Sequence, residues 1–258
     1  MSLSSLPLLG DLGLPLFKSA PHACPYLPRR MASELVAFPH GVDSVAYQML
    51  MNRGFRRSGA IFYKPDCPRC RSCVPIRVPV ASFGPSRSQR RALARNRDVS
   101  LRVHEPVCDR ARYELFIRYD RFKHDGQTCV GFDEFEAHFC FSPIDTIEMD
   151  YYLGDSLVGV GLVDVCPDGL SSVYFYFEPD QARRSLGIYS ALCEIDLCRS
   201  RGLAHWYVGF VVDGCPKMSY KSAFRPHELM RPDGRWIPGD APGATEPEAM
   251  HNADNRLS

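Results

Sequence analysis

The sequence contains no apolar run that approaches the roughly 20 residues of a transmembrane helix. Its opening segment, MSLSSLPLLGDLGLPLF, lacks the basic region and the small-residue cleavage site of a secretory signal, and its prolines and glycines predict a segment that drapes over the surface or frays. The formal net charge is only +1, so the chain as a whole is not a polyanion binder by composition. We expect a cytoplasmic protein without a membrane partner, and a monomer.

Eleven cysteines are a high count for a cytoplasmic chain, in which thiols stay mostly reduced. Most of those outside one cluster fit strands or helix faces and are interpreted as small buried hydrophobic residues. These are Cys108, Cys129, Cys140, Cys166, Cys193 and Cys198.

Three further thiols fall at regular spacing in KPDCPRCRSCVPIR, at Cys67, Cys70 and Cys73. With Cys24 of HACPYLP as a fourth ligand, they are candidates for a zinc or iron–sulfur site. A zinc ribbon would have a second CxxC pair at matching spacing, and the sequence has none. A redox site and a purely structural cluster therefore remain alternatives to a metal site.

A basic block surrounds and follows these thiols. Between residues 64 and 97 a single acid, Asp66, stands against nine cations, and Ser86 or Ser88 is placed to cap a helix that carries several of them. Clustered arginines are what contact with nucleic-acid phosphates requires, whereas a solvated face balanced by acids elsewhere in space is the alternative. The cations are Lys64, Arg69, Arg71, Arg77, Arg87, Arg90, Arg91, Arg95 and Arg97.

The second half of the chain changes pattern. Two amphipathic helices, RARYELFIRYDRF and FDEFEAHF, precede three strands of an antiparallel meander separated by Gly-Asp and Pro-Asp-Gly turns. A helix over residues 183–203 and a further strand then follow. The predicted strands are Ile147–Leu153, Leu157–Val165, Ser172–Phe177 and His205–Val212.

This order suits a GNAT-like acyltransferase fold, although periodicity alone does not make it unique. The first half predicts a helix ending at Gly54 and two short strands, Ala60–Tyr63 and Val74–Val80, whose prolines suggest edge or interrupted strands. We therefore predict an α+β protein in which a small cysteine-containing α/β domain, residues 1–100, precedes a GNAT-like domain, residues 101–238. Residues 239–258 contain almost no apolar side chains and are predicted to be disordered.

The loop from Glu178 to Gly187 precedes the last predicted helix. A helix N-terminus offers unpaired amides and partial positive charge to a phosphate or an oxyanion, Arg183 and Arg184 add fixed charge, and Ser185 adds a hydroxyl. An acetyl-CoA loop on this fold usually carries more than one glycine, so CoA binding is disfavoured. An ordinary helix start is the alternative.

The segment WYVGFVVDGCPKMSYKSAFRP interleaves aromatic rings with cations. Such a mixture suits an unstacked nucleotide and its backbone, while core and rim aromatics are the alternative. The residues are Trp206, Tyr207, Phe210, Tyr220, Lys217, Lys221 and Arg225.

Together these segments resemble the aminoacyl-tRNA–protein transferases, that is, the arginyltransferases and their bacterial leucyltransferase relatives. The likeness rests on HACPYLP, GFRRSG, CPRCRSCVPIRV, PSRSQRRALARN, SSVYFYFEPD, RSLGIYSAL and WYVGFVVDGCPKMSYKSAFRP, in the family's order over most of residues 20–238. The short length and the CPxCxxC form resemble the bacterial leucyltransferase branch. In the family's cysteine pattern Cys24 and Cys73 match, whereas Leu27 and Ser72 stand where further cysteines would lie, and Cys67 and Cys70 are candidate substitutes.

The resemblance implies transfer of an aminoacyl group from charged tRNA to the N-terminal amine of proteins that begin with Asp or Glu, which marks them for degradation. Leucine is the expected donor amino acid, and arginine is the alternative. A CoA-dependent N-acetyltransferase and a non-catalytic, metal-stabilised RNA-binding module are the competing functions. Aminolysis of an ester needs no cofactor and no strong base, because an α-amine has a pKa near ~7.7–8.0. Positioning and oxyanion stabilisation should supply most of the rate.

We assign candidate roles on this basis. For catalysis we name the helix start at Ser185 and Gly187, with Tyr176, Glu178 or a water as proton acceptor. For the acidic acceptor we name Arg56, Arg57, Arg77 and His124, with Lys217 and Lys221 as further cations that could pair with its carboxylate. The tRNA and donor set is Arg87, Arg90, Arg91, Arg183, Arg184, Trp206, Tyr207, Lys217, Tyr220 and Lys221.

Overall fold

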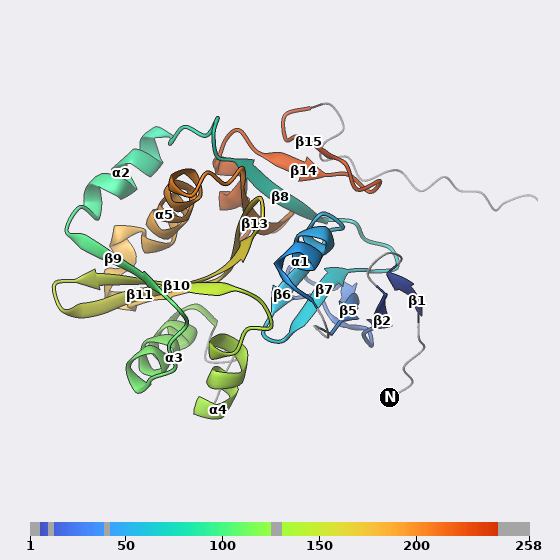
Figure 1. Ribbon diagram of the computed structural model, residues 1–258, viewed down its shortest axis with the longest axis horizontal. Coiled ribbons are helices and arrows are strands. Elements are labelled where there is room, and N and C mark those ends of the chain that lie inside the picture. The colour runs from blue at the N-terminus through green and yellow to red at the C-terminus, as the bar shows by residue number, and fades with distance from the viewer. Residues whose placement is uncertain (1–5, 10–12, 39–41, 125–130, 242–258) are drawn as a thin grey trace, which may run out of the picture.

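The structure, a computed structural model, describes residues 6–9, 13–38, 42–124 and 131–241 and consists of a larger and a smaller sheet with helices on both faces of the larger one (Figure 1). The larger sheet has eight strands, and its neighbouring strands are antiparallel except for one parallel pair. In sheet order they are β15 (Trp236–Pro238), β14 (Glu228–Met230), β8 (Cys73–Pro79), β13 (His205–Val212), β12 (Gly169–Phe177), β11 (Ser156–Cys166), β10 (Thr146–Leu153) and β9 (Val99–His104).

The predicted meander is confirmed by β10, β11 and β12, which pair antiparallel in chain order. Helix α5 (Leu186–Ser200) then carries the chain to β13, and Gly202, at φ +68, follows its end as expected. β13 is the parallel partner of β12, but the pairing covers only Gly169–Ser171 against His205–Tyr207. The carboxyl-terminal parts of β12 and β13 are therefore not paired with each other.

The smaller sheet has five strands from the first part of the chain, and a two-stranded sheet accompanies it. In sheet order the five are β1 (Leu6–Leu9), β2 (Leu14–Lys18), β5 (Glu34–Ala37), β7 (Ile61–Pro65) and β6 (Arg56–Ser58); β3 (His22–Ala23) and β4 (Met31–Ala32) form the pair. Helix α1 (Ser44–Met51) packs on this sheet through Tyr47 and Leu50. The expectation that the opening segment drapes or frays was wrong at β2, because Leu14 and Leu16 are buried in the same core.

Two elements that precede residue 100 belong with the larger sheet. Helix α2 (Arg87–Arg95) begins at Ser86, whose side chain accepts from the Gln89 amide while Gln89 reciprocates, so the predicted cap is confirmed. Strand β8 lies between β13 and β14, so of the two predicted forms, an edge or an interrupted strand, the edge strand was wrong. The pairing of β8 with β13 is irregular between Tyr207 and Gly209. The pairing of β8 with β14 covers only Ile76 and Arg77, and the prolines of β8 lie outside that pairing. The domain boundary near residue 100 stays a prediction.

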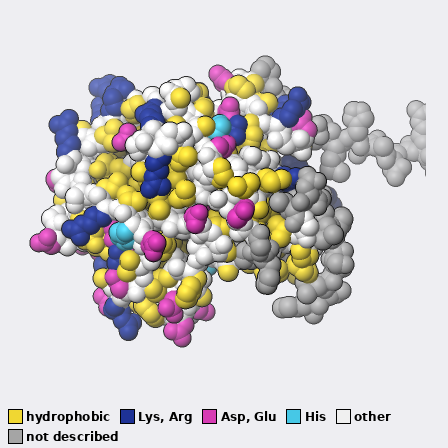
Figure 2. All heavy atoms as spheres, viewed as in Figure 1, with side chains coloured by type: hydrophobic (Ala, Val, Ile, Leu, Met, Phe, Trp, Pro, Cys, Tyr) yellow, Lys and Arg dark blue, Asp and Glu magenta, His cyan; other side chains and the backbone are white. Residues whose placement is uncertain are grey.

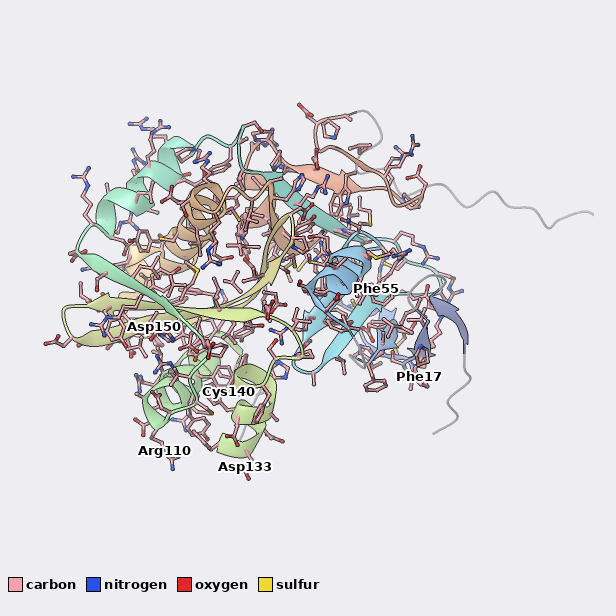
Figure 3. All side chains as sticks on the ribbon, viewed as in Figure 1. Phe17, Phe55, Arg110, Asp133, Cys140 and Asp150 are labelled. Carbon is pink, nitrogen blue, oxygen red and sulfur yellow. The ribbon has the colours of Figure 1, made fainter. Side chains whose placement is uncertain are left out.

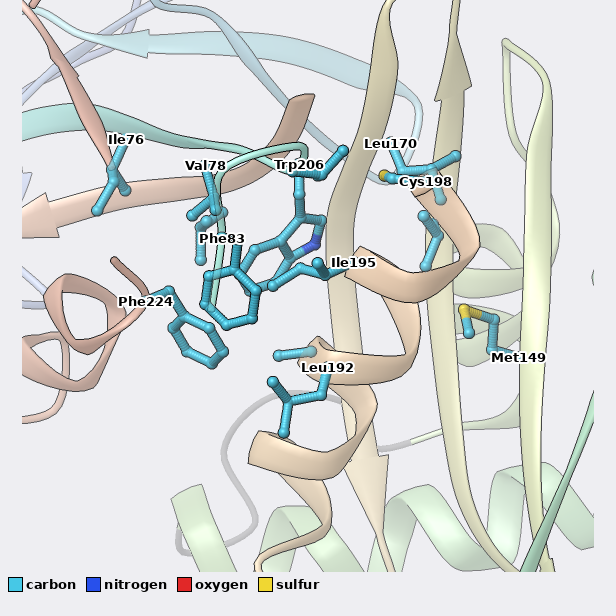
Figure 4. Packing of buried hydrophobic residues seen from close by; sticks show 14 of the residues in the cluster. Ile76, Val78, Phe83, Met149, Leu170, Leu192, Ile195, Cys198, Trp206 and Phe224 are labelled. Carbon is cyan, nitrogen blue, oxygen red and sulfur yellow. The ribbon is translucent and has the colours of Figure 1, made fainter. Parts of the chain in front are cut away.

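Helices cover both faces of the larger sheet. α2 and α5 lie on one face, whereas α3 (Arg110–His124) and α4 (Phe132–Phe135), which continues as the π-helix η2 (Glu136–Cys140), lie on the other (Figure 1). Trp206 packs between β13 and α5 in the core of the first face (Figure 4). No helix within the described ranges is long and apolar enough to cross a membrane. Residues 242–258 of the predicted tail lie outside the described residues.

Candidate functional site

Helix α2 presents a basic surface. Arg87, Arg90 and Arg91 are exposed, and no ion pair is recorded for them within the part of the chain that the structure describes. Lys and Arg side chains gather at the upper left of the space-filling view, over this helix (Figure 2). No described acid balances these three arginines through an ion pair, which favours the phosphate-contacting interpretation of the basic block over a face balanced by acids elsewhere in space.

Helix α2 is fastened to the start of α5. Arg95 donates to the Ser185 hydroxyl over 3.1 Å and to the carbonyl of Arg183, and Asn96 Nδ2 donates to the carbonyl of Arg184 over 2.9 Å. Arg184 itself is paired with Asp98 at 2.8 Å. The predicted RNA-contacting helix and the predicted reactive loop therefore lie together, through two residues, Arg95 and Asn96, that no sequence pattern marked for this role.

The backbone at the start of α5 has an unusual conformation. The 3₁₀ helix η3 (Pro179–Arg184) leads into Ser185, which adopts the left-handed region at φ +59 and ψ +46. This costs a residue other than glycine roughly 1–2 kcal/mol. Gly187 is exposed one residue into the first turn, where helix amides have no partner within the helix. The Ser185–Gly187 turn thus remains a candidate for binding a carbonyl oxygen.

The two other predicted catalytic side chains lie elsewhere. Tyr176 is 1% exposed within the aromatic core under α3, against Phe116 and Phe135, and burial raises its pKa well above the usual value. Proton uptake by its phenolate is therefore disfavoured. Glu178 forms an ion pair of 2.8 Å with Arg118. The structure does not bring Tyr176 and Ser185 together.

The predicted nucleotide-stacking residues are mostly core residues. Trp206 donates its Nε1 hydrogen to Glu194 over 2.7 Å and packs edge-on against Phe224. Tyr207 is buried, with its hydroxyl donating to Asp168 and accepting from Gln48. Stacking of a base on either ring disagrees with this burial, because both faces are already covered. Tyr220 is 46% exposed and Lys217 is exposed, so these two remain available at the surface.

The candidate acceptor cations differ sharply in what surrounds them. Arg57 is neutralised by Asp164 at 2.7 Å, with both side chains at most 2% exposed. Arg77 pairs with Glu228 at 2.6 Å and lies over the Trp236 ring. The side chain of His124, at the end of α3, lies outside the described residues.

Arg56 and Lys221 are buried without such a counter-charge. They are 3% and 9% exposed, and no described carboxylate forms an ion pair with either. Lys221, on the 3₁₀ helix η4 (Ser219–Ala223), has its pKa lowered to about 8, first by burial and then by the charge of Arg56. The pair lies where β6 of the smaller sheet approaches β13, since Arg56 contacts the carbonyl of Gly209 over 3.5 Å.

The four candidate metal ligands lie in one region. Burial raises the pKa of Cys73 to about 12, with added contributions from the thiols of Cys67, Cys70, Cys24 and Cys215. Cys215 was not among the predicted ligands, although it lies within the aromatic and basic segment of residues 206–226.

The sulfur positions do not form a metal centre as they stand. Among the described residues, no three of the five sulfur atoms all lie within 4.8 Å of one another, a spacing that a shared ion requires. Partial burial raises the pKa of Cys70, but hydrogen bonds from Ser72 and Arg30 outweigh it and leave that pKa below its usual value.

A second group with metal-ligand chemistry is already neutralised. His104, Glu148 and Asp150 converge between β9, β10 and α3, and Figure 3 shows Asp150 on its strand. The guanidinium of Arg112 donates to both carboxylates, in the place a cation would take. Burial raises the pKa of Glu148 to about 7. This group is an internal ion-pair network.

The chain matches the N-terminal and the C-terminal part of one protein family, in that order along the sequence. The family described as "Arginine-tRNA-protein transferase, N terminus" matches residues 22–91, and "Arginine-tRNA-protein transferase, C terminus" matches residues 111–231. The solved C-terminal domain of a putative lysylphosphatidylglycerol synthetase from Agrobacterium fabrum has a TM-score of 0.48 at 13% identity, covering 74% of this chain and 62% of that chain.

Several curated relatives carry one name, "Aspartate/glutamate leucyltransferase". The relative from Marinobacter nauticus is 36% identical over 86% of this chain and 95% of its own length. Those from Shewanella putrefaciens and Pseudomonas fluorescens are 39% and 37% identical, covering 82% and 87% of this chain and 90% and 96% of their own lengths. The chain therefore belongs to the arginine-tRNA-protein transferase family, within the group of relatives named aspartate/glutamate leucyltransferases.

Proposed function

We propose that the protein transfers leucine from leucyl-tRNA to the N-terminal amine of proteins that begin with Asp or Glu, and so marks them for degradation. The names of its relatives support the reaction. The structural observation that carries it is the basic face of α2. Its arginines Arg87, Arg90 and Arg91 are exposed and form no ion pair with any described acid, and its end is fastened by Arg95 to the Ser185 turn. RNA phosphates on α2 would bring the 3′ end of the tRNA towards that turn.

The chemistry needs few groups. The neutral amine nitrogen of the acceptor attacks the ester carbonyl carbon, the bond from that carbon to the ribose oxygen breaks, and the ribose hydroxyl leaves with a proton from the amine. Amides at the first turn of α5 are suited to the oxyanion formed on the way. No cofactor enters this scheme.

The strand order supports a GNAT-like acyltransferase fold. β10, β11 and β12 form an antiparallel meander, α5 follows, and β13 lies parallel to β12 before the two strands part. A CoA-dependent N-acetyltransferase on this fold is the competing function, and the segment from Glu178 to Gly187, which leads into the first turn of α5, has a single glycine where a CoA loop usually has more. We further propose that the enzyme acts as a cytoplasmic monomer.

A transfer assay read by mass spectrometry tests the proposal. Purified protein receives leucyl-tRNA, arginyl-tRNA or acetyl-CoA, together with peptides that begin with Asp, Glu, Lys or Ala. We expect the mass of leucine to be added to the Asp and Glu peptides alone. Addition of the mass of arginine would show that the donor is arginyl-tRNA and not leucyl-tRNA. Addition of an acetyl group would show that the protein is an acetyltransferase and not an aminoacyltransferase. No addition from any donor, with tRNA still bound, would favour an RNA-binding module.

A further inference from the structure

We propose that Arg56 and Lys221 together bind the side-chain carboxylate of the acceptor's N-terminal Asp or Glu and so determine acceptor specificity. This inference rests on the proposed transfer reaction, whose acceptors carry that carboxylate. It distinguishes these two cations from Arg57 and Arg77, whose charges are neutralised by Asp164 and Glu228.

The first argument is charge without a counter-charge. A buried ion normally has a partner, because transfer of an isolated charge out of water costs several kcal/mol or more. Arg56 and Lys221 are 3% and 9% exposed, and the described residues supply neither with a carboxylate. The arrangement repels itself, since the charge of Arg56 also lowers the pKa of Lys221. A bound anion would supply the missing charge.

The second argument is the hydrogen bonding of the two side chains. Lys221 Nζ donates to the carbonyl of Phe210 over 3.0 Å, and Pro75, which lies opposite Phe210, has no N–H to offer. A neutral donor would satisfy that carbonyl equally well, so the charge of Lys221 is not explained by it. Arg56 donates through Nη1 to the carbonyls of Met51 and Phe55, while its buried Nε–H has no partner in the described structure.

The third argument is the space beside the cations. Gly209 adopts φ +91 at an irregularity in the pairing of β13, and a Cβ there would lie 3.3 Å from Lys221 Nζ. A side chain at this position would crowd the ammonium group, and glycine avoids that contact. The guanidinium of Arg56 lies over the rings of Tyr207 and Phe210, at 5.7 and 5.6 Å. These rings hold it in place without neutralising it.

These surroundings favour a carboxylate over an RNA phosphate. Charges that track a nucleic-acid backbone are placed on exposed surfaces, as on α2, where salt and water reach them. Arg56 and Lys221 are instead buried, and the guanidinium of Arg56 lies over the rings of Tyr207 and Phe210. Figure 3 shows Phe55, the residue before Arg56, beside α1 in this interior region. Hydrogen bonds between charged groups in such a place are stronger than those between neutral groups.

Direct binding separates this inference from the transfer reaction. Peptides that begin with Asp, Asn, Glu or Gln are titrated into the full-length protein without tRNA, and KM and kcat for transfer are then measured with the same peptides. We expect wild-type protein to prefer Asp over Asn by about 100-fold, the effect of two such hydrogen bonds. Lys221→Met should raise KM for the Asp peptide about 10- to 100-fold, leave kcat within about threefold and abolish the Asp-over-Asn preference.

Two further variants keep the test decisive. Lys221→Gln retains a donor for the Phe210 carbonyl but removes the charge, and should lose the preference as Lys221→Met does. Arg56→Lys retains a charge but not the guanidinium fork, and should weaken Asp and Glu binding. Lys18→Met is the matched control, because Lys18 is an exposed cation on β2 that is paired with Asp66. This variant should leave peptide binding, KM and kcat unchanged.

The outcomes are distinguishable. Folded Lys221→Gln that still prefers Asp over Asn would overturn the inference, as would a loss of uncharged-tRNA binding with peptide binding intact, because the anion would then be a phosphate. If wild-type protein transfers nothing, the proposed reaction fails. Selective binding of Asp peptides, abolished in Lys221→Gln, would support the site even then.

Discussion

Arg57 and Asp164 form a buried, two-pronged ion pair between β6 of the smaller sheet and β11 of the larger one. Arg57 Nη2 lies 2.7 Å from Asp164 Oδ1 and Nε lies 2.8 Å from Oδ2, while Thr146 also donates to the carboxylate. Its neighbour Arg56 has no such partner among the described residues. Two adjacent arginines in one motif thus have different functions, one joining the sheets and one left with its charge unmatched.

Asp164→Asn should therefore destabilise the protein strongly. The substitution leaves the Arg57 charge buried and uncompensated, which typically costs about 3–5 kcal/mol of unfolding free energy. Urea denaturation followed by circular dichroism measures this. Asp66→Asn, which removes the partner of Lys18 in a pair whose side chains are 42% and 34% exposed, is the control and should cost less than about 1 kcal/mol. Equal losses in the two variants would contradict the structural role of Arg57.

Lys221 predicts a specific dependence of stability on pH. Its pKa is about 8 in the folded protein against a usual value of 10.5, so the unfolded chain binds more protons between these pH values. Stability should then rise with pH through this window, by up to about 1.4 kcal/mol per pH unit. Below pH 8 both states are protonated and the full penalty remains.

The informative quantity is the difference between wild type and Lys221→Met in urea unfolding at each pH. The charged and titratable groups that face Lys221, namely Arg56, Cys73 and Cys215, are present in both proteins and cancel in that difference. If the unfolding free energies of the two proteins change with pH in parallel between pH 8 and 10.5, the pKa of Lys221 is not lowered in the folded protein.

The basic face of α2 predicts a salt-dependent loss of tRNA binding. Replacing Arg87, Arg90 and Arg91 together by Gln should weaken uncharged-tRNA binding and reduce the salt slope of the binding constant by about one for each phosphate that is no longer neutralised. The melting temperature should not change, because these side chains are exposed and form no recorded ion pair in the described ranges. Filter binding at several salt concentrations measures the affinity and the slope. Arg235→Gln, which removes an exposed cation paired with Asp233, serves as control, and equal slopes would exclude α2 from the tRNA surface.

The thiol cluster is expected to organise the N-terminal region and take no part in acyl transfer. Cys67→Ser and Cys70→Ser should lower stability or metal retention and leave the choice between leucyl- and arginyl-tRNA unchanged. Thermal unfolding measures stability, and elemental analysis with absorption spectroscopy measures metal retention. The transfer assay measures the choice of donor tRNA. Cys193→Ser, on α5, is the matched control. Retained stability together with a changed donor would contradict this role.

Tyr176→Phe should change the transfer rate by less than about threefold, because the raised pKa keeps the phenol protonated at neutral pH. Single-turnover transfer to an Asp peptide measures the rate. A decrease of about 100-fold or more, the size of a general-base effect, would show that the hydroxyl acts on the reacting groups after all.

Local patterns in the sequence were sufficient for the elements whose stability is local. The alternating segments and Gly-Asp turn predicted the β10–β12 meander, and Ser86 followed by Gln89 predicted the start of α2. The spacing of hydrophobic residues and the capping of a helix involve residues that are close together in the sequence. These elements can therefore be predicted without knowledge of the tertiary structure. The positive charge of the basic block at residues 64–97 could be predicted for the same reason.

Only the tertiary structure decided which candidate side chains are free to act. Arg57 meets Asp164, 107 residues away, Trp206 meets Glu194 on a neighbouring helix, and Cys215 joins the thiols around Cys73. Such long-range contacts determine whether a cation has an acidic partner and whether an aromatic ring lies in the core or at the surface. By itself, the sequence determined the family, the basic block and the element types of the meander, α5 and β13. The fold decided that the charges of Arg56 and Lys221 remain unmatched among the described residues, because charge compensation is set by neighbours in space and not along the chain.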